Sequence, residues 1–319
     1  MTGAGDDTDD DGGSGDEEAG AAVREAAFVY DEWDFQQNDY RPAWCHVHQK
    51  RVEPARFAQP EEGWLDEARK VRAVFERLKP DLARREKHLA DGDNINADLL
   101  LDYLVDRSRE PSPPVRFYER PIINHRDLAV LILLDVSGST GEQLGSQAKV
   151  LDVEKQASVI LGQGLAALGD RFAVCGFCSN GRELCEYLIF KGFDDPWSGD
   201  TIGRVMAAWS HSSTRIGPAL RHSGYLLSLQ PARQRLVILV TDGKPMDQGY
   251  DPNTRYAQHD VRMACEENAR QDVHTFAIST EENSLADMEI MFPRRRFVIL
   301  PSIRQLPRIL PQLYLRLTL

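Results

Sequence analysis

The sequence predicts an α/β protein with a doubly wound, mostly parallel β-sheet that has helices on both faces. First, residues 128–134 are all apolar without alternation, a pattern typical of a strand buried on both faces. Second, strand and helix patterns alternate from about residue 127 to the end, as they do in parallel sheets. Third, 42% of the 319 residues are hydrophobic and 28% are charged, which is typical of a globular chain with one large domain and a smaller unit.

The predicted elements of the large domain, residues 122–319, alternate along the chain and show no internal repeat. Strands are expected at 128–134, 171–177, 184–190, 236–241, 273–278 and 296–300. Helices are expected at 147–168, 200–209, 217–229, 255–271, 284–292 and 303–316.

Residues 22–121 are predicted to form the smaller unit, an aromatic-rich and mainly helical extension. Aromatic side chains gather near its start, in residues 28–35. One helix is expected near 61–77 and another at 97–107. Asn96 is the expected N-cap of the second helix, because an asparagine side chain can accept a hydrogen bond from the first helical turn.

The excess of acidic over basic residues is concentrated at the start of the chain. Residues 1–21 contain eight Asp and Glu residues and no Lys or Arg, so they account for most of the net charge of −12 and leave −4 elsewhere. A Gly- and Asp-rich segment cannot bury a core, so we expect a disordered acidic tail. It is either a solvating leader or an interaction tail. The acidic balance also argues against nucleic-acid binding, which needs a basic surface.

The sequence indicates a cytoplasmic protein. No stretch reaches about 18 consecutive apolar residues, so no transmembrane helix is expected, and the acidic start does not resemble a secretion signal. The cysteines are five in number and have no framework spacing, which suits a reducing compartment.

Three oxygen-bearing side chains follow the strand expected at 128–134. Asp135, Ser137 and Ser139 occupy alternate positions, which point to the same side of an extended segment. Open α/β sheets bind ligands at the carboxyl ends of their strands, and hard oxygen ligands suit Mg²⁺, with Mn²⁺ as an alternative. A helix N-cap followed by a turn is the simpler interpretation of the same residues.

The spacing Asp-x-Ser-x-Ser resembles the metal-ion-dependent adhesion site of von Willebrand factor type A (VWA) domains. The other parts of that site follow in order: a threonine loop at Thr214 and a second buried strand that ends in Thr241-Asp242-Gly243. The resemblance implies that Ser137, Ser139 and Thr214 bind the metal directly, and that Asp135 and Asp242 hold it mainly through water. It also implies one open coordination position, which a carboxylate of a partner protein fills.

Further segments resemble the NorD/CbbO group of VWA proteins. These are Glu32-Trp-Asp after Tyr30, Trp44-Cys45, Val153-Glu-Lys, 169–182, 193–197 and 241–245. The resemblance implies an adaptor that works with a MoxR-type AAA+ ATPase on a client enzyme, which is nitric oxide reductase for NorD and Rubisco for CbbO. NorD-like activation of nitric oxide reductase is the expected function, and a CbbO-like Rubisco adaptor is an alternative. Members usually carry a long helical region upstream, in place of which this sequence has its acidic tail. A stand-alone binding module without an ATPase is therefore a further alternative.

The residues predict recognition rather than catalysis. There is no Gly-x-x-x-x-Gly-Lys-Ser/Thr loop, and 243–245 is not a phosphate cradle because proline lacks the backbone donor. A serine hydrolase would need Gly-x-Ser-x-Gly, but 136–138 lacks the first glycine. A metal-dependent hydrolase is the rival hypothesis, with His211 and His222 as candidate general bases. If nucleotide energy is used, we expect a partner to hydrolyse it.

Four other patterns have a structural and a functional interpretation. Cys175 and Cys178 have the spacing of a redox pair, but three-residue spacing on a strand places them on opposite faces, so we expect buried strand cysteines. Residues 45–48 suggest zinc without a second cluster. Residues 91–98 resemble a calcium loop with isoleucine at a ligand position. Residues 247–251 lie either at the rim of the metal site or in a solvated loop.

Overall fold

The structure is a computed structural model of the chain. It describes residues 26–54, 62–78, 84–109, 112–122, 127–138, 143–144, 148–209, 212–251, 253–292 and 296–300, with residues 305, 309 and 314. The predicted acidic tail, Ser139 and almost all of the predicted helix 303–316 lie outside these residues. No helix in the described ranges is long and apolar enough to cross a membrane.

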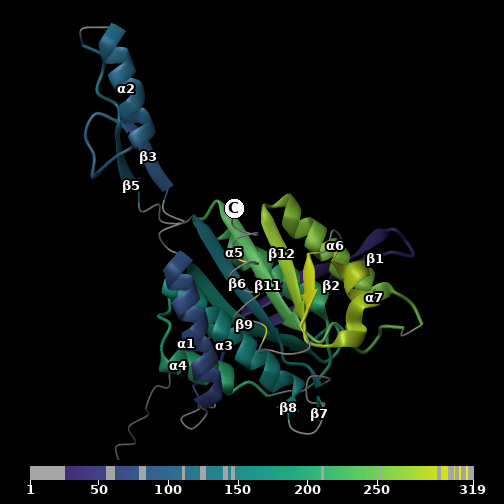
Figure 1. Ribbon diagram of the computed structural model, residues 1–319. Helices are drawn as coiled ribbons and strands as arrows, with labels where there is room; N and C mark the ends of the chain where they lie inside the picture. The colour runs from purple at the N-terminus through teal and green to yellow at the C-terminus, as the bar shows by residue number, and fades with distance from the viewer. Residues whose placement is uncertain are drawn as a thin grey trace, which may run out of the picture.

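An eight-stranded sheet forms the centre of the molecule (Figure 1). Its strands, from one edge to the other, are β1 (Ala26–Asp34), β2 (Asp39–Arg51), β10 (Cys185–Lys191), β9 (Arg171–Ser179), β6 (Leu128–Asp135), β11 (Gln234–Thr241), β12 (Val273–Ser279) and β13 (Phe297–Ile299). The six strands from β6 onward thus stand in the order 3-2-1-4-5-6, which is typical of doubly wound α/β folds. All neighbouring pairs are parallel except β1 with β2 and β9 with β10, so the predicted fold class is confirmed.

Helices cover both faces of this sheet. The helices are α1 (Glu62–Leu78), α3 (Val150–Leu168) and α4 (Gly199–Met206) on one face, and α5 (Ile216–Ser228), α6 (Tyr256–Arg270) and α7 (Leu285–Met291) on the other. A two-strand ribbon, β7 (Gln143–Leu144) with β8 (Ala148–Lys149), precedes α3, and a 3₁₀ turn, Glu282–Ser284, precedes α7. The predicted helices and strands between 128 and 300 are present, with ends shifted by a few residues.

The burial of strand β6 on both faces explains why its sequence shows no alternation of apolar and polar residues. All eight of its residues are buried. Val130 and Ile132 pack in the cluster that contains α1 and α3, whereas Leu131 and Leu133 pack in the cluster that contains α5 and α6. Apolar side chains are therefore needed at the seven positions before Asp135, as expected for a central parallel strand.

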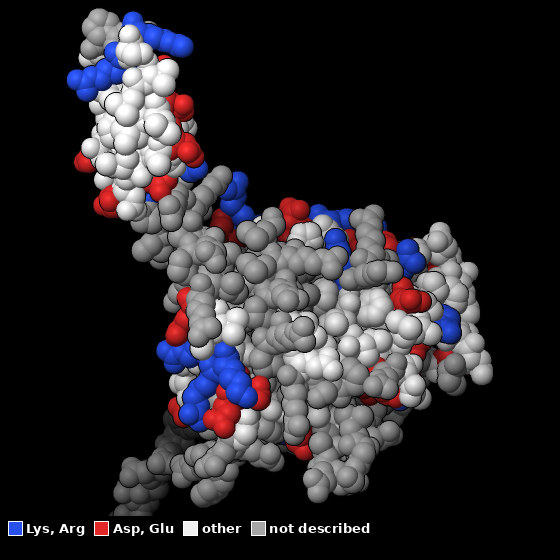
Figure 2. Space-filling model, in the orientation of Figure 1, with Lys and Arg blue, Asp and Glu red and all other residues white. Residues whose placement is uncertain are grey.

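A small arm projects from the sheet domain (Figure 1). It contains β3 (Arg84–Leu89), β4 (Asn94–Ile95) and β5 (Tyr118–Ile122) in an antiparallel sheet, together with α2 (Ala97–Arg109). Asn96 caps α2 as predicted, since its Oδ1 accepts from Leu99 N at 3.2 Å. Helix α2 buries none of its residues, and Leu101, Leu104 and Val105 are exposed. Figure 2 shows that this face of the arm is mostly uncharged between charged groups at its tip and edges.

The prediction for residues 22–121 needs correction, because this region is not mainly helical. Its aromatic segment forms the β1–β2 hairpin, and β2 pairs with β10, so the hairpin extends the central sheet. The alternating burial of β1 gives the physical reason. Phe28, Tyr30, Glu32 and Asp34 are the less exposed residues, and those between them are more exposed, which is the period of a half-buried strand.

Candidate metal centre

The predicted site lies where the winding of the sheet reverses. The chain leaves β6 towards β9 on one side, and it returns to β11 on the other side of β6. Doubly wound sheets bind ligands at this reversal, outside the carboxyl ends of the strands. Asp135 ends β6, and Thr241 ends β11 directly before Asp242. The two predicted aspartates therefore follow neighbouring strands at the same edge of the sheet.

Asp135 is completely buried and held by two donors. Its Oδ1 accepts from Ser137 N at 3.0 Å, and its Oδ2 accepts from Thr241 Oγ1 at 2.7 Å. Burial, followed by repulsion from Asp242, raises the pKa of Asp135 to about 7, although the hydrogen bonds from Ser137 and Thr241 act in the opposite direction. A carboxylate in this position gains stability from a nearby cation.

Asp242 is positioned by a tight turn. It is 2% exposed, and its Oδ1 accepts from Lys244 N at 2.9 Å. Gly243 has a φ of +83°, which favours glycine, and an added Cβ would lie 2.8 Å from Cβ of Ser284. Gly243 N also donates to Thr241 Oγ1 at 3.1 Å. The sequence Thr-Asp-Gly thus orients both its threonine hydroxyl and its aspartate.

The Thr214 loop is fixed to the same edge by backbone hydrogen bonds. Ser213 and Ser179, at the end of β9, exchange two such bonds of 2.8 and 2.6 Å, and Thr214 N donates to Met246 O at 2.7 Å. Gly138 N donates to Ser212 O at 2.7 Å, which joins this loop to the segment after β6. Thr214 itself is 2% exposed.

The structure places Asp135, Ser137 and Asp242 near one another, and backbone hydrogen bonds attach the loop of Thr214 to the same edge of the sheet, whereas Ser139 lies outside the described residues. All four are buried. Among the side chains that the structure describes, no three His, Cys, Asp or Glu residues form a group that could hold a metal ion. An ion at this edge would therefore depend on hydroxyl oxygens and water together with the carboxylates, which are the ligands that Mg²⁺ prefers.

A third carboxylate, Glu154 of α3, was not predicted as part of the site. It is completely buried, and its Oε1 accepts from Thr280 Oγ1 at 3.4 Å. Its Oε2 has no hydrogen-bond partner in the structure as described. Burial, followed by repulsion from Asp135 and Asp242, raises the pKa of Glu154 well above its ordinary value. No clear sequence signal pointed to it, because Asp152 and Lys155 stand beside Glu154 in the first turns of α3.

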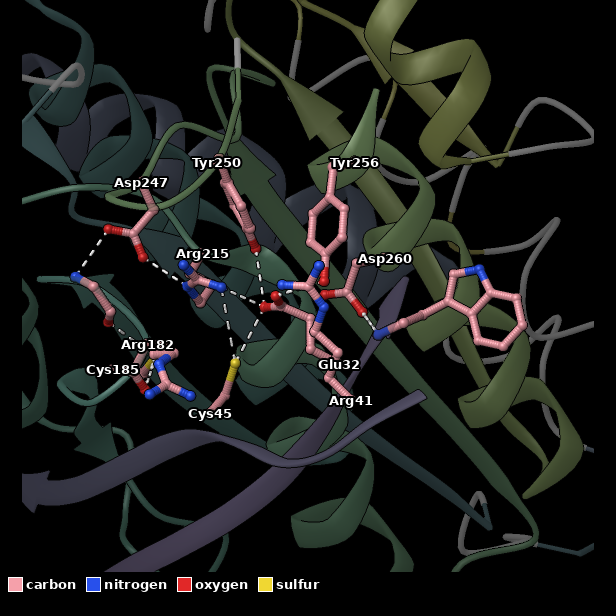
Figure 3. Close-up of polar contacts among 12 residues, drawn as sticks. Glu32, Arg41, Cys45, Arg182, Cys185, Arg215, Asp247, Tyr250, Tyr256 and Asp260 are labelled. Atoms are coloured by element: carbon pink, nitrogen blue, oxygen red, sulfur yellow. Dashed lines mark hydrogen bonds and ion pairs between the residues drawn. The ribbon is translucent and has the colours of Figure 1, made fainter. Parts of the chain in front are cut away.

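Arg215, next to Thr214, connects the site to the N-terminal hairpin (Figure 3). Its guanidinium is paired with Glu32 of β1 and with Asp247, and it also donates to Gln248 O at 2.9 Å. The side chain of Asp247 is fully buried, and Tyr250 lies under Arg215 at 4.1 Å from ring centroid to guanidinium carbon. These two residues of 247–251 therefore belong to a buried network at the rim of the predicted site.

A cavity of about 510 Å³ lies beside this network. Its walls come from the hairpin and from the loops that follow β9 and β11, and they include Glu32, Arg41, Trp44, Arg182, Arg215 and Tyr256. The ring of Trp44 packs against two guanidinium groups, with Arg182 at 3.8 Å and Arg41 at 5.0 Å from its centroid.

Cys175 and Cys178 are buried strand residues, as predicted. Both lie on β9, and neither forms a disulfide. Cys175 packs in the cluster that contains α5 and α6, whereas Cys178 packs in the cluster that contains α1 and α3. The two thiols therefore face opposite sides of the sheet.

Relatives in sequence match nearly the whole chain, and two of them illustrate the similarity. The sequence is 33% identical over 295 residues to "Protein NorD" of Brucella suis biovar 1 (strain 1330), which covers 91% of this chain and 45% of that protein. It is 34% identical over 289 residues to an uncharacterized protein of Pseudomonas aeruginosa, with coverages of 90% and 46%. The chain thus spans about half the length of the curated relatives it matches. No family model matches the sequence.

Solved structures with a similar fold superpose only loosely. A von Willebrand factor type A structure from Catenulispora acidiphila aligns with a TM-score of 0.39 and 15% identity, over 59% of this chain and 42% of that one. The PilB minor pilin from Streptococcus sanguinis aligns with a TM-score of 0.49 and 15% identity, over 66% of each chain. The strand order of the central sheet remains the basis for assigning the fold.

Proposed function

We propose that this chain, a NorD-like protein with the fold of a VWA domain, is a cytoplasmic adaptor that binds an acidic residue of a client enzyme through Mg²⁺. In this proposal a MoxR-type AAA+ ATPase acts with the adaptor to remodel and activate the client, and nitric oxide reductase is the expected client. The ATPase supplies the energy, and the chain supplies recognition.

The residues at the reversal of the sheet fit a magnesium ion. Ser137 and Thr214 would supply hydroxyl oxygens, together with Ser139 according to the sequence, while Asp135 and Asp242 would accept hydrogen bonds from metal-bound water. The bound ion would supply a Lewis-acidic position for a carboxylate oxygen of the client. The backbone bonds that join the Thr214 loop to the segment after β6 and to the end of β9 keep these groups at one edge before any ion arrives.

The observation that carries the proposal is the burial of three mutually repelling carboxylates at one edge of the sheet. Asp135, Asp242 and Glu154 are at most 2% exposed, and the first two act electrostatically on the third. Burying a carboxylate costs several kcal/mol unless it is paired. A divalent cation would offset this cost and would also place a positive charge near Glu154 Oε2.

The hydrolase hypothesis receives little support from its candidate bases. His222 is completely buried, and its two ring nitrogens lie 2.8 Å from Tyr30 Oη and 2.9 Å from Gln49 Oε1, both on the hairpin. Its role is therefore in packing the hairpin against α5. His211 lies outside the described residues. Binding of a client carboxylate remains the function that the described residues support best.

A magnesium-dependent pull-down from the source cell tests the proposal. Wild-type protein should recover a AAA+ ATPase and a client enzyme, and the client should be lost in EDTA or with Asp135→Ala. Asp127→Ala is the matched control, because Asp127 is a half-exposed aspartate at the opposite end of β6, and it should recover both partners. Recovery of Rubisco would favour the CbbO-like alternative, and recovery of a client alone would favour the stand-alone module. Unchanged client recovery with Asp135→Ala would refute metal-dependent binding.

A further inference from the structure

Glu32 of β1 accepts hydrogen bonds from four different side chains. It is 1% exposed and is paired with Arg215 Nη1. Tyr256 Oη donates to it at 3.0 Å, Cys45 Sγ at 3.1 Å and Tyr250 Oη at 3.4 Å. Figure 3 shows Glu32 between these groups, with donors from the hairpin, from α5's preceding loop and from the segment after β11. One carboxylate therefore joins three parts of the chain that are distant in sequence.

Arg215 connects Glu32 to the loops of the proposed metal site. It follows Thr214 directly, so the position of its side chain restrains the Thr214 backbone. Its Nε donates to Asp247 Oδ2 at 2.6 Å, and Asp247 Oδ1 accepts from Gly181 N at 3.0 Å. Because Arg215 also donates to Gln248 O, its guanidinium joins the Thr214 loop to the loop after β11 and, through Asp247, to the loop after β9.

Asp247 alone cannot replace Glu32 in this network. Arg215 is 2% exposed. A buried guanidinium is most stable when the N–H donors on both sides of its planar group have hydrogen-bond acceptors. With glutamine in place of Glu32, Nη1 of Arg215 would lose its carboxylate, and only one of the two oxygens that accept from Tyr250 and Tyr256 would remain. Unpaired buried donors are costly, so the side chains of this network, and the Thr214 backbone with them, would rearrange.

We infer that Glu32 is a positioning residue for the proposed metal centre, and that the N-terminal hairpin contributes to that centre by restraining the Thr214 loop. Through Arg215, Glu32 restrains the Thr214 loop, which backbone hydrogen bonds attach to the segments after β6 and β11. The inference rests on the proposed function, because it assumes that Thr214 binds the ion.

The hairpin has other attachments that do not pass through Glu32. Strand β2 pairs with β10 along five residue pairs, from Cys185 with Val47 to Ile189 with Arg51. Tyr30 Oη bonds to His222 Nδ1 at 2.8 Å, and Trp33 N donates to Asp260 Oδ1 at 2.9 Å. A substitution at Glu32 should therefore leave the hairpin in place, so its effect on the metal site can be measured separately.

The test compares Glu32→Gln with Tyr30→Phe in the full chain. The first removes the charge that faces Arg215, whereas the second removes one hydrogen bond on the same strand away from the metal loops. Calorimetric titration with Mg²⁺ should show binding about tenfold weaker for Glu32→Gln, at the lower end of the range for residues that orient metal ligands, and unchanged for Tyr30→Phe. Thermal unfolding of both variants controls for stability. Should Glu32→Gln fail to fold, Arg215→Lys, which keeps the charge but loses the fork, should show the same weakening.

Hydrogen exchange of the metal-free protein gives a second measurement that does not require an ion. Amides of residues 213–216 should exchange faster in Glu32→Gln than in wild type or Tyr30→Phe. Equal Mg²⁺ affinity and equal exchange in wild type and Glu32→Gln would overturn the inference and leave the proposed function standing. Absence of Mg²⁺ binding by wild-type protein would overturn both.

Discussion

Thr241 donates a hydrogen bond from its Oγ1 to Asp135 Oδ2 at 2.7 Å, and so joins the carboxyl ends of two neighbouring parallel strands. Val240 pairs with Leu134 one step earlier, where β11 lies beside β6. The same hydroxyl accepts from Gly243 N at 3.1 Å, which orders the turn that carries Asp242. A residue that is not among the predicted ligands thus orients both predicted aspartates.

Replacing Thr241 with valine should weaken metal binding. The variant keeps the shape of the side chain but leaves Asp135 Oδ2 and Gly243 N without this partner. Loss of a hydrogen bond that orients a ligand group typically costs 10–100-fold in metal affinity. Thr241→Ser keeps the hydroxyl and should retain affinity near that of wild type. Calorimetric titration with Mg²⁺ measures both, and equal affinities for the valine and serine variants would contradict the orienting role.

Gly138→Ala should destabilise the protein and disturb the metal loop. An added Cβ would lie 2.7 Å from Ser212 O, closer than a real Cβ contact allows. Overpacking of this kind costs about 1–3 kcal/mol, and denaturant unfolding measures it. Gly199→Ala is the control, since an added Cβ there has no neighbour within 4 Å. Equal stability of the two variants would show that the approach of the Ser212 loop is not tight.

His222 should make the protein less stable as the pH falls. Burial lowers its pKa to about 4, while Tyr30, Tyr187 and Tyr225, with Phe28, surround the ring. Because the pKa of His222 in the folded protein lies below the unfolded value of about 6.5, the contribution of the neutral ring to the free energy of unfolding is fully present above pH 6.5. It is lost between about pH 6.5 and 4, by up to about 3 kcal/mol.

His222→Gln provides the comparison for this titration. The carboxylates titrate over part of the same range, so the measured quantity is the difference in unfolding free energy between wild type and variant at each pH. That difference should shrink as the pH falls from 6.5 to 4. A difference independent of pH would mean that His222 is not buried as a neutral ring.

The cysteines should react as structural thiols. All five are free, and burial raises the pKa of both Cys175 and Cys265 to about 12, so little thiolate exists at neutral pH. We expect slow labelling by a thiol reagent in the native protein and labelling of all five after denaturation. Rapid native loss of two thiols as a disulfide would instead indicate a redox pair.

The parts of the fold that follow from local sequence were predictable. The apolar run of β6 reports burial on both faces, and Asp135 and Asp242 end up together because neighbouring parallel strands end at one edge. The hairpin was missed as sheet structure because Phe28, Tyr30 and Glu32 combine aromatic and charged residues on its inner side. Their alternation was the available signal.

The contacts around the site depend on distant residues. Glu32 and Arg215 are 183 positions apart, and no spacing rule connects them. Glu154 lies in the first turns of α3, and its relation to Asp135 and Asp242 depends on how that helix packs across the sheet. Such pairs arise from tertiary packing, so motifs could suggest candidate ligands, whereas the residues that contact those candidates from distant parts of the chain could not be predicted.

The most direct test of the account is a calorimetric titration of metal-free wild-type protein and Asp242→Asn with Mg²⁺. The account predicts one Mg²⁺ bound per wild-type chain and no measurable binding by the folded variant. Absence of binding by wild type, or equal binding by folded Asp242→Asn, would contradict the assignment of a metal centre to the carboxyl ends of β6 and β11.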